Sequence, residues 1–102
     1  MKNEYKIVSV VLGILFFIAP FTGCAVAPPV QEMSDARQAI QADEAVGART
    51  KAPEPYIEAQ ENIESAESAL QAGDYSKARE QALRAKINAL EARSKALTDE
   101  DP

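Results

Sequence analysis

The chain has 102 residues and a net charge of −5, and this length allows one small domain at most. It contains no histidine and a single cysteine, so it cannot by itself build a Ser/His/Asp triad, a histidine-ligated zinc site or an internal disulfide. The acidic balance also disfavours nucleic acid as a partner, because phosphate neutralisation requires a basic surface. We therefore expect a small protein that is not an enzyme.

The N-terminal residues have the pattern of a secretory signal. Lys2 and Lys6 precede a run of 13 apolar or small residues, Ile7 to Ala19, which fits the length of a signal-peptide hydrophobic region. Thr22-Gly23-Cys24 follows. Small residues immediately before a cysteine and after an apolar run resemble the lipobox of bacterial lipoproteins.

The lipobox resemblance implies a lipid anchor at Cys24. In that family the cysteine thiol receives diacylglycerol, signal peptidase II cuts before the cysteine (here between Gly23 and Cys24), and the new amino group is acylated. Three acyl chains at ~0.8 kcal/mol per buried CH₂ hold a protein on a membrane essentially permanently. Ala25 stands where an aspartate would retain the protein at the inner membrane. The expected location is therefore the periplasm-facing side of the outer membrane, with the inner membrane as the alternative. No cofactor other than this lipid is expected.

A second interpretation of the same segment stays open. No charge occurs from Ile7 to Gln31, and about 20 apolar residues suffice to cross a bilayer. The chain would then be an uncleaved, single-span adaptor or a small subunit of an inner-membrane complex. Pro20 and the pair Pro28-Pro29 interrupt the apolar stretch, which favours the cleaved signal.

The expected organisation is a signal peptide over 1–23, a lipidated tether over 24–29, a helical domain over 30–97 and a flexible tail over 98–102. Cleavage would leave 79 residues with a net charge of −6. This part is rich in alanine, the residue with the highest helix propensity. We therefore predict an all-α domain with a thin core.

Apolar residues recur every three or four positions in three segments, which predicts three helices. The first covers about 30–48. Gly47 and then the prolines at 53 and 55 are expected to end it, because proline cannot continue a helix. The second covers about 54–72, and its heptad seam consists of Tyr56, Ala59, Ile63, Ala66 and Leu70. Gly73, Asp74 and Tyr75 form the predicted turn, because glycine ends a helix and aspartate caps the next one.

The third predicted helix, about 75–97, has two apolar faces. One is a seam of small residues: Ala78, Ala82, Ala85, Ala89, Ala92 and Ala96. The other is a stripe of larger residues: Leu83, Ile87, Leu90 and Leu97. We expect helix 54–72 to pack on the alanine seam as a coiled-coil-like hairpin, and helix 30–48 to cover the leucine face and complete a three-helix bundle.

Charge favours the same hairpin. Segment 54–72 has glutamates and no basic residue, whereas segment 75–97 carries a net +4. Folding back at Gly73 is expected to bring Arg79 near Glu67 and Lys86 near Gln60, which would favour one register. The glutamates at 58, 61, 64 and 67 are interpreted as a solvated face, so no metal site is predicted.

Several of these elements together resemble the domain-of-unknown-function 4398 family of small bacterial envelope domains. The resemblance is carried by the turn Ala72-Gly73-Asp74-Tyr75, by Ala52-Pro53 and by the alanines at 48, 59, 66, 78, 82, 85 and 89. The family is commonly found on lipoproteins and has no known activity, so the resemblance implies a location and a fold rather than a reaction.

The functional expectation is a non-enzymatic envelope lipoprotein whose helical domain acts as an interaction or structural module. Small-residue stripes favour helix docking, which predicts an envelope protein partner or a homo-oligomer. Neither nucleic acid nor a small-molecule substrate is expected.

Overall fold

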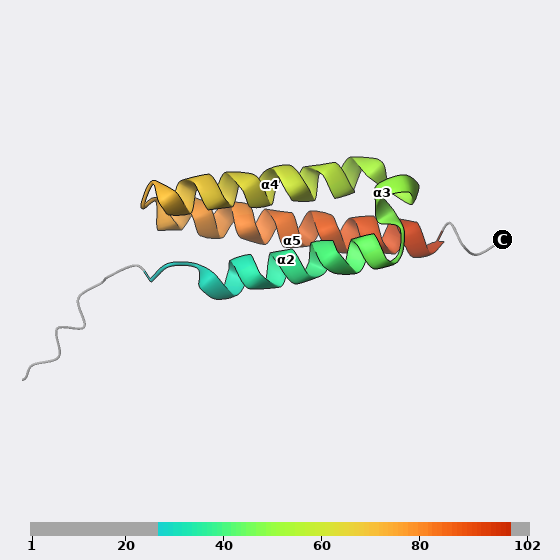
Figure 1. Ribbon diagram of the computed structural model, residues 1–102, viewed down its shortest axis with the longest axis horizontal. Coiled ribbons are helices and arrows are strands. Elements are labelled where there is room, and N and C mark those ends of the chain that lie inside the picture. The colour runs from blue at the N-terminus through green and yellow to red at the C-terminus, as the bar shows by residue number, and fades with distance from the viewer. Residues whose placement is uncertain (1–26, 99–102) are drawn as a thin grey trace, which may run out of the picture.

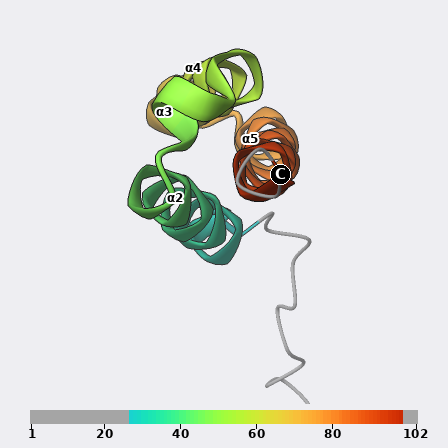
Figure 2. The same cartoon turned by 90° about the vertical axis from the view of Figure 1, so that its right-hand side faces the viewer.

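The computed structural model describes residues 27–98, which are helical almost throughout and contain no strand in that range. The helices are α2 (Val30–Ala45), α3 (Ala48–Lys51), α4 (Pro53–Gln71) and α5 (Tyr75–Thr98). In Figure 1, α2 and α5 run in the same direction, and α4 runs in the opposite direction. The end-on view shows the three long helices at the corners of a triangle (Figure 2). The predicted all-α helical domain is confirmed.

The first predicted helix is two helices in the structure. α2 stops at Ala45, and Gly47 follows with φ of 73°. This left-handed conformation breaks the helix and is one that glycine adopts without strain. The single turn of α3 then redirects the chain, and Pro53 begins α4 in the first helical turn, where a missing N–H is tolerated.

The turn between α4 and α5 is closed by backbone hydrogen bonds around Gly73, whose φ is 77°. The Asp74 N–H donates to the Ala69 carbonyl at 2.9 Å, and the Gly73 N–H donates to the Leu70 carbonyl at 3.1 Å. This pattern satisfies the last carbonyls of α4. The Asp74 carboxylate in turn accepts the Lys77 N–H at 3.2 Å and caps α5.

The core is built around a helix that contributes only alanine. The buried residues of α5 are Ala78, Ala82, Ala85, Ala89, Ala92 and Ala96. Larger buried side chains come from the other two long helices, among them Met33 and Ile40 of α2 and Tyr56 and Ile63 of α4. Because alanine projects only a methyl group, both neighbours can approach the α5 backbone closely while supplying the bulk that fills the interior.

The expectation that the first helix covers the leucine face was wrong. α2 packs beside α4 on the alanine side of α5, and its Met33, Ala36 and Ile40 join the same core as the alanines. Leu83, Ile87, Leu90 and Leu97 stay 45–63% exposed. One physical reason lies in charge: Arg79 and Lys86, at one edge of the alanine seam, attract the acidic side chains of α2.

The predicted partners of Arg79 and Lys86 were also wrong, although α4 and α5 align in the register that the turn at Gly73 requires. Arg79 pairs with Glu32 of α2 at 3.1 Å, and Lys86 lies 3.9 Å from Asp35 of α2. Glu67 of α4 instead pairs with Arg37 of α2 at 2.9 Å.

The α4–α5 register itself is visible in another contact. Asn88 donates a hydrogen bond to Glu58 at 3.1 Å. Because α4 and α5 are antiparallel, moving nine residues forward from Glu58 along α4 corresponds to moving nine residues back from Asn88 along α5. The same register therefore sets Glu67 opposite Arg79. The register was therefore predicted, and only the direction in which the Arg79 side chain turns was not.

Enlarging a residue of the alanine seam should destabilise the fold. We expect Ala85→Leu to lower the free energy of unfolding by about 1–3 kcal/mol, because a leucine at this fully buried position forces α2 and α4 away from α5. Chemical denaturation followed by circular dichroism measures the effect. Ala45→Leu, at an exposed position at the end of α2, is the matched control and should change stability by less than about 0.5 kcal/mol. Equal effects of the two substitutions would contradict this packing.

Candidate functional site

The residues predicted for lipid attachment, Gly23 and Cys24, lie outside the described residues 27–98. The predicted turn residues Gly73, Asp74 and Tyr75 lie together between α4 and α5. Of the predicted packing residues, the buried ones are Ala59, Ile63, Ala66, Ala78, Ala82, Ala85 and Ala89. Leu70 is partly buried at the edge of the same core.

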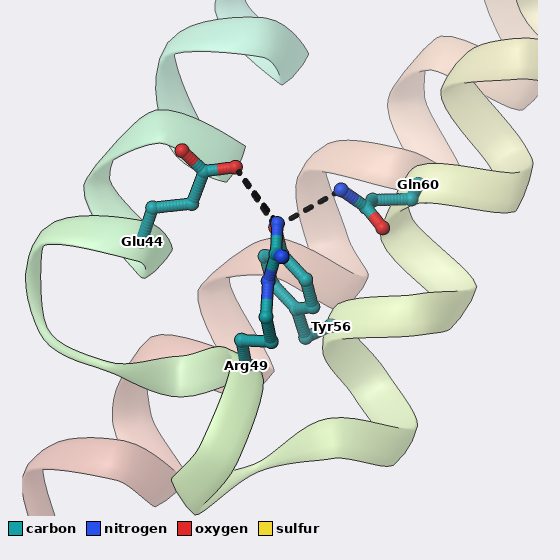
Figure 3. Close-up of polar contacts among 4 residues, drawn as sticks. All are labelled: Glu44, Arg49, Tyr56 and Gln60. Atoms are coloured by element: carbon teal, nitrogen blue, oxygen red, sulfur yellow. Dashed lines mark hydrogen bonds and ion pairs between the residues drawn. The ribbon is translucent and has the colours of Figure 1, made fainter.

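A polar cluster around Tyr56 joins three helices at one end of the bundle (Figure 3). The Tyr56 hydroxyl donates to Glu44 of α2 at 2.9 Å. It accepts hydrogen bonds from Arg49 of α3 at 3.1 Å and from Gln60 of α4 at 2.9 Å. The ring itself is buried, so its apolar body fills the core while its hydroxyl gathers polar groups at the edge.

Arg49 holds the short helix α3 against this cluster in two further ways. Its guanidinium carbon lies 5.5 Å from the centroid of the Tyr56 ring, within the range of a cation–π interaction. A guanidinium nitrogen of Arg49 also lies 3.7 Å from a carboxylate oxygen of Glu44. The seam spacing of the sequence identified Tyr56 as a packing residue. That spacing could not predict the hydrogen bonds of the Tyr56 hydroxyl, because these depend on where α2 and α3 end.

Asp43 is a buried acid that the sequence analysis did not single out. Its side chain is fully buried, and neither carboxylate oxygen has a hydrogen-bond partner among the described residues. Burial raises the pKa of Asp43 to about 6, and the positive charge of Arg93 partly opposes this shift. A signal was present in the sequence, because Met33, Ala36, Ile40 and Asp43 follow the 3,4,3 spacing of one helix face.

The described residues 27–98 contain no group of three or more His, Cys, Asp or Glu side chains placed to hold a metal ion. Within the same range, no helix has the length and apolar character needed to cross a membrane.

The most distinctive surface feature is the exposed stripe of α5, which we define as Leu83, Ile87, Leu90 and Leu97. Its residues lie on α5 at roughly 130° from the alanine seam, as 3.6 residues per turn dictates. Single exposed apolar residues are common on protein surfaces, whereas these four form a continuous row along one helix. Ser94 lies between Leu90 and Leu97 on the same face.

Removing the Tyr56 hydroxyl should loosen the junction of α2, α3 and α4. We expect Tyr56→Phe to lower the free energy of unfolding by about 1–3 kcal/mol, because three hydrogen bonds, two of them to charged groups, are lost. Tyr75→Phe, at the start of α5, is the control for loss of a hydroxyl and should cost less than about 0.5 kcal/mol. A Tyr56→Phe protein as stable as the parent would show that the cluster contributes nothing.

The buried carboxyl of Asp43 should make stability depend on pH. A pKa raised from 3.8 to about 6 means that the folded state favours the protonated acid. Its contribution is complete below about pH 4 and is lost as the pH rises through 6. We expect Asp43→Asn, which cannot ionise, to gain up to about 3 kcal/mol relative to the parent between pH 4 and pH 7.5. Denaturation at both pH values measures the gain, and a constant difference between the two proteins would contradict it.

The chain was compared with protein families, curated proteins and solved structures. Neither the curated proteins nor the solved structures contained a match to it. The model of the family described as Domain of unknown function (DUF4398) matches residues 31–101. This range runs from the second residue of α2 past the end of α5 and includes the Tyr56 cluster and the exposed stripe, and the chain therefore belongs to the DUF4398 family.

Proposed function

We propose that this protein is a non-enzymatic lipoprotein of the bacterial cell envelope. Lipid on Cys24 anchors it to the periplasmic side of the outer membrane, and its helical domain binds another protein. The sequence supports the anchor through the apolar run, the small residues Thr22 and Gly23, and the cysteine that follows them.

The distance between anchor and domain supports a module that works close to the membrane. α2 begins at Val30, six residues after Cys24. An extended chain of that length spans at most about 20 Å. Pro29 is already buried against the domain, so the helical bundle stays within a short reach of the lipid surface.

The single observation that carries the interaction role is the exposed stripe of α5. A folded domain that buries alanines while Leu83, Leu90 and Ile87 stay about half exposed has not used its most hydrophobic surface for its own core. Covering such a surface is favourable at about 25 cal/mol per Å² of apolar area. The geometry thus supports binding rather than catalysis as the role of the domain.

Blocking lipid attachment should leave a longer protein that is not processed. We expect Cys24→Ser, or an inhibitor of signal peptidase II, to cause a precursor larger by residues 1–23 to accumulate, because cleavage requires the modified cysteine. Immunoblotting of fractionated envelopes measures both size and location.

Ala27→Ser is the matched control and should be cleaved like the parent. A parent protein whose size is the same with and without the inhibitor would contradict the proposal. That result would favour the uncleaved single-span anchor instead.

A further inference from the structure

We infer that Asp43 is a pH-sensitive latch, whose ionisation releases the end of α2 and the short helix α3 from α5 while the remainder of the bundle stays folded. The latch belongs to the folded domain and does not rest on the proposed lipid anchor. A general loss of stability would open the whole bundle, whereas a latch opens one end of it.

The closed bundle offers no place for a negative charge on Asp43. The side chain is fully buried, and neither carboxylate oxygen has a hydrogen-bond partner among the described residues. A buried carboxylate without hydrogen bonds is costly, so the packed arrangement favours the protonated acid. Burial accordingly raises the pKa of this carboxyl to about 6.

The charged and titratable groups on the three elements around the end of α2 do not supply the missing partner. Arg93 of α5 partly offsets the effect of burial by its charge, but it donates no hydrogen bond to the Asp43 carboxylate. On α3, Arg49 donates to the Tyr56 hydroxyl of α4 at 3.1 Å, and Lys51 likewise makes no hydrogen bond to Asp43. An ionised Asp43 therefore gains its hydrogen bonds by meeting water.

Asp43 lies where part of α2 can detach without its neighbours unfolding. α2 ends two residues later, and the left-handed Gly47 and the four-residue α3 follow. The other end of α2 is held separately, by the buried Pro29 and by the pair between Arg79 and Glu32 at 3.1 Å. Because short segments at element ends open at a lower free energy than a core hairpin, hydration of Asp43 requires movement of this end alone.

The Tyr56 cluster holds the same end closed and so opposes the latch. Glu44, the residue after Asp43, accepts a hydrogen bond from the Tyr56 hydroxyl at 2.9 Å (Figure 3), and opening breaks this contact. Ionisation therefore changes the ratio of open to closed molecules rather than abolishing the closed form. A pKa of about 6 when closed, against 3.8 when hydrated, raises that ratio roughly tenfold between pH 5 and pH 7.5.

Hydrogen exchange of the full-length chain in a non-ionic detergent, read by mass spectrometry at pH 5 and pH 7.5, tests the latch. Carboxylates with ordinary pKa values are already mostly ionised at pH 5. Protection is expressed relative to unstructured peptide at the same pH, which removes the chemical pH dependence of exchange. We expect the protection of residues 40–51 to fall roughly tenfold from pH 5 to pH 7.5.

The α4–α5 hairpin is the internal reference for this measurement. Its core amides exchange through complete unfolding, which ionisation of Asp43 also favours, so the level of protection distinguishes the two events. At pH 7.5, residues 40–51 should be about tenfold or more less protected than the hairpin, because they open without it.

Three substitutions assign the effect to the buried carboxyl. Asp43→Asn should remove the pH dependence of residues 40–51, because an amide does not ionise. Asp35→Asn is the matched control, since Asp35 is a partly exposed acid of the same helix that lies 3.9 Å from Lys86, and it should leave the pH dependence in place. Arg93→Gln should make the fall in protection larger than in the parent, because it removes the positive charge that favours ionised Asp43.

The latch is overturned if residues 40–51 are as protected as the hairpin at pH 7.5, because the bundle then opens only as a whole. It is also overturned if these residues are poorly protected but insensitive to pH, as fraying requires, or if Asp35→Asn removes the pH dependence as Asp43→Asn does. None of these results bears on processing at Cys24, so failure of the latch and failure of the proposed anchor are distinguishable.

Discussion

The fold depends on one constraint, which is that α5 offers only methyl groups to both of its neighbours. Six fully buried alanines line that seam, so α2 and α4 can approach the same helix and share one core. The bulk must then come from the neighbours, and Met33, Tyr56 and Ile63 supply much of it. Close packing of this kind tolerates little change in side-chain volume. Each alanine position therefore restricts its residue as strictly as a position that holds a larger core side chain.

Polar contacts then determine which neighbour occupies which side of α5. Exposed ion pairs such as Arg79–Glu32 and Arg37–Glu67 contribute about 0–1 kcal/mol each, too little to hold the bundle together. They nevertheless select an arrangement, since exchanging α2 and α4 would set Arg79 beside other partners. The Tyr56 cluster joins α2, α3 and α4 at the far end through Arg49, and the buried Ala48 adds packing of α3 on the core.

Helix content, the turn at Gly73 and the register of the hairpin follow from the sequence, because local propensity and heptad spacing determine them. The side of α5 that α2 occupies does not follow. Hydrophobicity alone would bury Leu83 and Leu90 before Ala85 and Ala89, and the structure does the reverse. Both α2 and α4 approach the α5 backbone along the alanine seam, and the pairs between α2 acids and α5 cations add only a small preference for that side. The buried Asp43 could be foreseen only as a position on the inner face of α2.

A thin alanine core also connects folding to assembly. Domains of this size bury a small share of their surface and gain little stability from it, and here the largest apolar side chains of α5 contribute little to the monomer. A partner protein that covers the stripe would bury the same side chains, so association would add stability that the isolated domain lacks. Anchoring the chain on a membrane that also holds the partner would raise the effective concentration of the two proteins. The lipid would thus act on the stability of the fold as well as on its location, through the exposed stripe of α5.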